Sequence, residues 1–138
     1  MKKILALDLG DQWVGMALSD VLHILAKPYK TVTVNQLENS LKDIFNEQEI
    51  DVIIVGYPKT MKGGHSQQTE KVIATKEKLE ALFVDKKWIL WDERLSSKRA
   101  DSLKKKSTKE DAIQSHARAA AFILDTYLTY QRNMRDLD

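Results

Sequence analysis

Three short apolar runs limit the folds open to this chain. They are residues 4–9, 52–55 and 88–91, and polar or turn residues bound each of them. Uninterrupted apolar runs of this length are typical of strands that are buried on both faces of a sheet. The chain therefore folds around a buried sheet that gathers strands from distant parts of the sequence.

Two further strands are predicted between the first and second runs. Residues 15–19 and 29–34 have strand-like composition and follow the first run closely enough to return antiparallel to it. Lys27 and Pro28 are expected to form a break before the second of these strands, which therefore starts after them, because proline interrupts a ladder of hydrogen bonds.

Helices are predicted in four places. They are residues 37–45 with Asn35 as the cap, residues 72–83, a short segment after Ser96, and a last helix that begins near Ser107. The order of elements predicts an α/β fold with a mixed five-stranded sheet, three strands antiparallel and then two parallel, and helices on both faces. With no repeat and no linker, residues 1–138 are expected to form a single domain.

Composition excludes several classes of protein. The 138 residues are 43% hydrophobic and 30% charged, which is ordinary for a globular domain. The absence of cysteine excludes disulfides and thiolate zinc sites. The apolar run at the N-terminus is too short for a signal peptide or a membrane span, so we expect a cytoplasmic protein with no membrane partner.

Asp8 is the first candidate for chemistry. It follows the apolar residues 4–7 and precedes Leu9-Gly10 and then Gly15. A carboxylate in or beside a central strand is costly unless a cation compensates it, and a divalent metal ion is the usual cation. The alternative is an aspartate that caps a turn.

A second acidic group follows the strand at 88–91. Asp92 and Glu93 are adjacent, so only one of them can face the same side of the sheet as Asp8. We favour Glu93 as a metal ligand, with Asp92 in reserve. Arg94 is a candidate for a phosphate contact, and Ser96 is either a substrate contact or only a helix cap.

Basic residues in two predicted loops are candidate nucleic-acid contacts. Lys59 and Lys62 follow the glycine at position 56, where the backbone can approach a ligand closely. Six more cations lie between residues 98 and 109. Clustered lysines pair with phosphates, although a solvated loop has the same composition.

Taken in order, these motifs resemble one family, the YqgF-type pre-16S rRNA nucleases, also called RuvX-like Holliday-junction resolvases. The resemblance covers nearly the whole chain, and the combination of motifs is specific where no single one is. The residues that carry it are Asp8-Leu9-Gly10 with Gly15 and Ser19-Asp20, Val55-Gly56-Tyr57-Pro58 with Met61 and Gly63, Asp92-Glu93-Arg94-Leu95-Ser96, and the final Ala119-Ala120, Ile123-Leu124 and Tyr127-Leu128.

The resemblance implies a ribonuclease H-like fold and a metal-dependent endonuclease that processes the 5′ end of precursor 16S rRNA in ribosome biogenesis. Two Mg²⁺ or Mn²⁺ ions would lie between carboxylates, bridged by Asp8 and approached by Glu93 from the neighbouring strand. The partner would be nucleic acid, either precursor rRNA or branched DNA. The sequence leaves open both this choice and the choice between a monomer and a homodimer.

One position departs from the family pattern. The last helix of the family usually has an aspartate eight residues before the leucine that matches Leu124, and this chain has His116 there. Imidazole is a good ligand for Mn²⁺, so we expect His116 to bind metal with weaker support for Mg²⁺. A core histidine is the alternative, and Asp111 is a less favoured substitute acid.

Two other classes of protein fit part of the sequence. The segment from Asp8 to Gly15 also resembles the phosphate-binding hairpin of actin-like ATPases and sugar kinases, but 138 residues leave no room for their second domain. A nucleic-acid-binding module that has lost catalysis is the other alternative, and His116 keeps it open.

Overall fold

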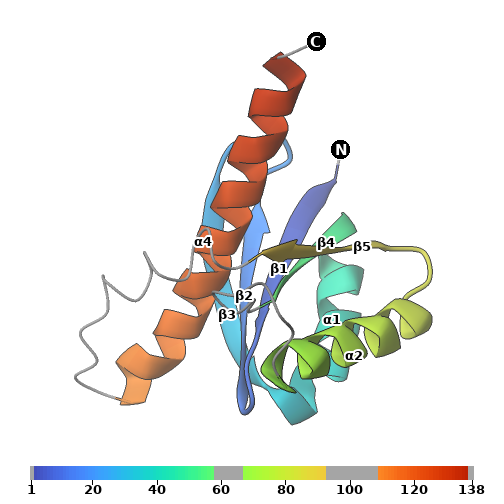
Figure 1. Ribbon diagram of the computed structural model, residues 1–138, viewed down its shortest axis with the longest axis vertical. Coiled ribbons are helices and arrows are strands. Elements are labelled where there is room, and N and C mark those ends of the chain that lie inside the picture. The colour runs from blue at the N-terminus through green and yellow to red at the C-terminus, as the bar shows by residue number, and fades with distance from the viewer. Residues whose placement is uncertain (1, 58–66, 93–108, 137–138) are drawn as a thin grey trace.

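A mixed five-stranded sheet with helices on both faces is the framework of the computed structural model, which describes residues 2–57, 67–92 and 109–136 (Figure 1). The strand order is β3-β2-β1-β4-β5, in which β1 pairs antiparallel with β2 and parallel with β4. β2 pairs antiparallel with β3, and β4 pairs parallel with β5. The predicted fold class is confirmed.

The elements follow the predicted order within the described ranges. The strands are β1 (Lys3–Leu9), β2 (Trp13–Ser19), β3 (Ala26–Thr33), β4 (Ile50–Tyr57) and β5 (Lys87–Asp92). The helices are the 3₁₀ turn η1 (Val34–Gln36), α1 (Leu37–Glu47), α2 (Gln67–Leu82) and α4 (Lys109–Asp136). The helix predicted after Ser96 lies outside the described residues.

Two apolar layers hold the sheet between its helices. On one face, alternate residues such as Leu5 and Leu7 of β1 pack under α1 and α2. On the other face, Ile4 and Ala6 pack with Ala120 and other buried residues of α4. Since successive side chains of a strand point to opposite faces, Asp8 continues the series that α4 covers.

Two local predictions were wrong. Pro28 lies inside β3, opposite Ala17, where the register of the ladder shifts. β3 is an edge strand, and an edge tolerates a proline because the missing N–H can face solvent. Asn35 belongs to η1 and does not cap α1, whose N-cap is Gln36.

None of the helices in the described part of the chain has the length and apolar character that a membrane crossing requires.

Candidate active site

Asp8 lies in the middle of a row of paired residues that crosses the sheet. It pairs with Gly15 of β2 on one side and with Gly56 of β4 on the other. Gly15 in turn pairs with Thr31, and Gly56 pairs with Trp91. Directly paired residues of neighbouring strands project to the same face, so the whole row faces α4.

Both ends of this row are tied to α4 by hydrogen bonds. The Thr31 hydroxyl donates to the carbonyl oxygen of Ile113 over 2.8 Å. At the other end, the indole N–H of Trp91 donates to the Thr126 hydroxyl over 2.9 Å. The helix that carries the last predicted ligand is therefore fixed to the strands on both sides of Asp8.

The two glycines beside Asp8 let α4 approach the sheet closely. A Cβ atom on Gly15 would lie 1.9 Å from the carbonyl oxygen of His116 and 2.8 Å from the amide nitrogen of Ala117. A Cβ atom on Gly56 would lie 2.5 Å from Cδ1 of Ile123. The backbone of His116 thus packs directly on the strand neighbour of Asp8.

The predicted ligands Asp8 and His116 are brought to one side of the sheet. His116 precedes Ala120 by four residues and Ile123 by seven, and both of these are buried against the sheet. Residues at such intervals share a helix face, so residue 116 is on the side of α4 that meets the strands. Both Asp8 and His116 are half-buried. A carboxylate and an imidazole thus belong to the same face of the sheet, with the backbone of His116 against the strand neighbour of Asp8.

Asp92 is on the other face of the sheet. It pairs with Tyr57, which packs in the core under α1 and α2. Its neighbour Trp91 shares the face of Asp8, as the alternation of side chains requires. The other predicted site residues lie outside the described residues: Glu93, Arg94, Ser96, Lys59 and Lys62. The side chain of Asp111 is likewise outside them.

The described residues supply only part of the ligand set that a divalent metal ion at Asp8 would need. Among the described side chains, no group of three or more His, Cys, Asp or Glu residues could hold a metal ion. Asp8 and His116 offer one oxygen and one nitrogen donor, which fit Mn²⁺, and the carboxylate also fits Mg²⁺. Further oxygen ligands are needed, and the predicted one, Glu93, follows the last described residue of β5.

Part of the family motif is structural. The Ser19 hydroxyl accepts the N–H of Ile4 over 2.8 Å. The carboxylate of Asp20 accepts the N–H groups of Ile24 and Leu25 over 2.7 and 2.9 Å. The Leu25 N–H is the main cause that holds the pKa of Asp20 below its ordinary value of 3.8. These two residues shape the β2–β3 loop, at the opposite end of the sheet from Asp8.

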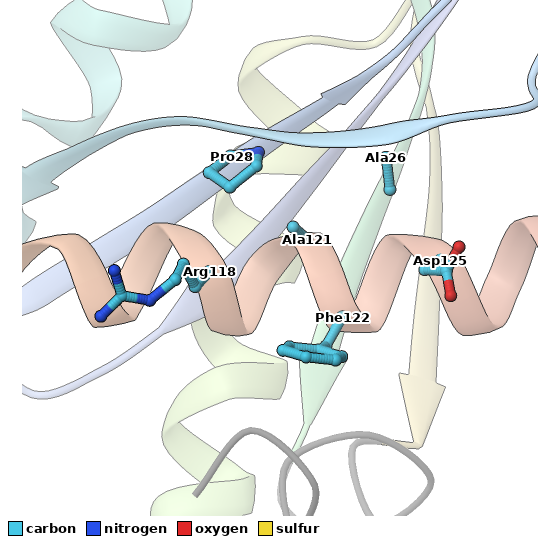
Figure 2. A pocket seen from close by; sticks show the side chains of 6 residues that line it. All are labelled: Ala26, Pro28, Arg118, Ala121, Phe122 and Asp125. Atoms are coloured by element: carbon cyan, nitrogen blue, oxygen red, sulfur yellow. The ribbon is translucent and has the colours of Figure 1, made fainter. Parts of the chain in front are cut away.

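A groove between β3 and α4 is lined by none of the predicted site residues within the described ranges (Figure 2). Its volume is about 300 Å³, and Figure 2 shows Arg118 and Asp125 on the helix, below Pro28 and Ala26 of the strand. One cation and one anion on a mostly apolar lining do not make a channel for phosphates. The groove is therefore not part of the candidate site.

Neither Thr31 nor Trp91 stands out in the sequence as a site residue, although both complete the row of Asp8. Their contribution depends on strand register, which is a property of pairing and not of either residue alone. The available signal for Trp91 was its place in the strand directly before Asp92, at the end where parallel strands of α/β proteins carry their ligands.

Comparisons with known proteins agree on one family. The family described as RuvX, Holliday junction resolvase, matches residues 2–130. A protein of Fusobacterium nucleatum subsp. nucleatum named "Putative pre-16S rRNA nuclease" is 34% identical over 138 residues, 96% of this chain and 100% of that protein. A Clostridium tetani protein of the same name is 41% identical over 98 residues, 69% of this chain and 70% of its own length.

The fold also matches a solved structure. RuvC of T. thermophilus, in complex with a Holliday junction substrate, has a TM-score of 0.57 at 11% identity, and 96% of each chain is covered. At this identity the likeness shows the fold alone. The predicted ribonuclease H-like fold and the predicted family resemblance are both confirmed.

Proposed function

We propose, because this chain belongs to the RuvX family of Holliday junction resolvases, that it is a nuclease that hydrolyses phosphodiester bonds at Asp8. The observation that carries the proposal is the position of Asp8 at the carboxyl end of β1, between Gly15 and Gly56. Because both neighbours lack side chains, α4 packs closely on the strands beside the carboxylate and brings the backbone of residue 116 to this end of the sheet. Ligands of open α/β sheets bind at this end of the parallel strands.

The proposed reaction depends on two divalent ions, Mg²⁺ or Mn²⁺. Asp8 would bridge them, and Glu93 and His116 would supply further ligands. When bound, such ions supply an activated water and stabilise the leaving oxygen. The role of the protein would be to hold these ligands in place. β1 fixes Asp8, and the close packing of α4 on Gly15 fixes the backbone of residue 116.

Between the two acids after β5, we retain Glu93 as the ligand. Asp92 pairs with Tyr57 on the face under α1 and α2, so it would have to cross the sheet to share an ion with Asp8. The residue after Asp92 is the next one that strand alternation would direct to the face of Asp8. Arg94, Ser96, Lys59 and Lys62 remain proposed contacts to the phosphates of the substrate.

The substrate we propose is the 5′ end of precursor 16S rRNA, cut as an endonuclease would cut it. The names of the relatives from Fusobacterium nucleatum and Clostridium tetani support this choice. With such a substrate the reaction would take place in the cytoplasm. A four-way DNA junction is the second candidate, because the description of the family names it. A module that binds nucleic acid without cleaving it is the third, because of His116.

Cleavage by Asp8→Asn tests the proposal. The wild type and the variant are incubated with a precursor 16S rRNA fragment and with a four-way junction, in Mg²⁺ and in Mn²⁺, and binding is followed in parallel. We expect Asp8→Asn to lose cleavage by at least a hundredfold while it still binds, since one bridging ligand is gone. Asp51→Asn, an exposed carboxylate at the far end of β4, is the matched control and should cleave normally.

Cleavage by Asp8→Asn at the wild-type rate would refute the active site. No cleavage by the wild type with either metal, together with normal binding, would instead favour the binding module. Cleavage of the junction without cleavage of the rRNA fragment would favour the second substrate.

A further inference from the structure

The C-terminal half of α4 runs beside the β2–β3 loop (Figure 1). A second concave surface lies between these two elements. Its volume is about 350 Å³, and we call it the Tyr130 pocket. None of the predicted site residues that the structure describes lines it. The residues that do are His23, Tyr127, Tyr130, Gln131, Met134 and Arg135.

The loop that forms one wall of the Tyr130 pocket is held in place. His23 has a φ of 58°, and its Nε2 atom lies 2.8 Å from the Lys2 carbonyl oxygen. A carbonyl oxygen can only accept, so Nε2 is the donor. The Arg132 guanidinium donates to the carbonyl oxygen of Ile24, which ties the loop to α4. Together with the Asp20 hydrogen bonds, these contacts make the wall preformed.

The opposite wall is an aromatic surface that is supported from behind. The Tyr130 ring lies 5.3 Å from the ring of Trp91, and Tyr127 lies 5.2 Å from the same indole, edge to face. The Trp91 indole is fixed by its hydrogen bond to Thr126, which itself donates to the Ile123 carbonyl oxygen. Tyr130 nevertheless remains 50% exposed. It offers a rigid aromatic face to a ligand.

Polar groups complete the Tyr130 pocket. The Gln131 amide donates to the Tyr127 hydroxyl over 2.9 Å, which leaves the phenolic proton available for donation. Burial raises the pKa of Tyr127 above 10.0, so this proton is kept at neutral pH. Arg135 takes part in none of the ion pairs found among the described residues.

These groups match the chemistry of an unpaired nucleotide. Single-stranded nucleic acid is bound by aromatic rings on which bases stack, by donors to the exposed base edges, and by cations that meet the phosphates. A base that is paired and stacked in a helix cannot present its face to Tyr130. A purely apolar partner would leave Arg135 and the Tyr127 hydroxyl without a role.

Trp91 relates the Tyr130 pocket to the candidate active site, because it belongs to the row of Asp8 and contacts Tyr130. Trp91 is two strands from Asp8 in the same row, roughly 10 Å away at the usual spacing of strands. The Tyr130 ring lies 5.3 Å from the ring of Trp91. Because the β2–β3 loop is at the opposite end of the sheet from Asp8, a nucleic-acid chain with its phosphate at Asp8 would reach the pocket with a base several nucleotides away.

We propose that the Tyr130 pocket binds an unpaired base of a single-stranded segment several nucleotides from the cleaved bond. The inference rests on the proposed nuclease function and specifies its substrate as one that has a single-stranded segment on this side of the cut. The base stacks on Tyr130, and Arg135 contacts a neighbouring phosphate.

Binding without divalent metal tests the proposal. A labelled single-stranded oligoribonucleotide, and the same strand paired with its complement, are titrated in EDTA and followed by fluorescence anisotropy. We expect Tyr130→Leu to weaken binding of the single strand at least about fivefold, the lower end for loss of one stacked base. Tyr130→Phe keeps the ring and should bind within about twofold of the wild type. Binding of the duplex should not change in either variant.

Arg135→Gln is a second variant at an exposed position, and it should weaken the single-strand complex and lower its salt dependence by about one unit. Unchanged single-strand binding in Tyr130→Leu, an equal loss for the duplex, or an equal loss in Tyr130→Phe would each overturn the inference. If Tyr130→Leu fails to fold, the result for Arg135→Gln decides in the same way.

One further outcome is separable from these. The loop beside the pocket exposes four apolar side chains, Val21, Leu22, Ile24 and Leu25. If Tyr130→Leu changes the mass measured by light scattering but not RNA binding, the surface belongs to a contact between copies of the chain, and the inference is wrong. Because binding is measured without metal, its result is independent of the Asp8→Asn cleavage test, so each proposal can fail alone.

Discussion

Replacing Gly15 by alanine should destabilise the protein far more than the same replacement at Gly56. The two glycines flank Asp8 on neighbouring strands, and neither has a φ in the left-handed region, so the comparison is purely steric. At Gly15 the new Cβ meets backbone atoms of α4, the nearest at 1.9 Å. At Gly56 it meets the end of the Ile123 side chain at 2.5 Å.

The expected loss of stability is larger at Gly15 because backbone atoms stand in the way there, whereas a side chain does so at Gly56. An ordinary contact begins near 3.4 Å, so α4 would have to withdraw from β2 by about 1.5 Å to accept Gly15→Ala. That movement would open the layer in which Ala120 and Leu124 are fully buried. Overpacking costs about 1–3 kcal/mol, and we expect Gly15→Ala at or above the upper end. Gly56→Ala needs only a rotation of Ile123 and should cost about 1 kcal/mol.

Urea denaturation measures both free energies of unfolding. With an m-value of about 1.5 kcal/mol per M, the midpoint of Gly15→Ala should fall by about 2 M and that of Gly56→Ala by less than 1 M. Alanine is intrinsically better than glycine in a strand, so a loss at Gly15 cannot come from propensity. A midpoint for Gly15→Ala at or above that of Gly56→Ala would refute the close packing of α4 on β2.

The remaining two predictions concern metal and pH. His116→Asp should raise Mg²⁺-supported cleavage relative to Mn²⁺-supported cleavage, because it restores a carboxylate ligand; equal activity of the two proteins in Mg²⁺ would contradict it. The lowered pKa of Asp20 means that its charged form favours the folded state above pH 3.8, and that this contribution is lost as pH falls through the lowered pKa. Asp20→Asn should therefore have a lower thermal midpoint than the wild type at neutral pH, and the gap should close in acid. A gap that persists in acid would show that the Asp20 charge is not its source.

Much of the fold could be predicted because its central strands β1 and β4 are largely buried on both faces. The runs at 4–9, 52–55 and 88–91 need no partner to be recognised, since mostly apolar segments of that length have few alternatives. The error at Pro28 has the opposite cause. Whether a proline breaks a strand or lies at its edge depends on which neighbour the strand has, and that information is not local.

The candidate site was predictable only in part, for a similar reason. Asp8 could be found because a charge at the end of an apolar run is expensive. The need for a glycine at position 15 could not be predicted from the sequence, since the contact that requires it is with residues 116 and 117, about a hundred positions away. Tyr127 is a buried residue on the face of α4 that meets the sheet. Its second role, as a wall of the Tyr130 pocket, depends on the β2–β3 loop that closes the other side.

The contact between Gly15 and α4 also explains how position 116 can change its residue type within one fold. The atoms of His116 that pack on Gly15 are its carbonyl oxygen and carbon, followed by the amide nitrogen of Ala117. All three are backbone atoms, which any residue supplies. The helix is thus placed by groups that do not change when the side chain at 116 changes. An exchange between histidine and aspartate there alters the charge and the donor atom offered beside Asp8 and leaves the position of the backbone as it was. For that reason His116→Asp isolates the chemistry of the ligand from the stability of the fold, whereas Gly15→Ala displaces the helix and changes both.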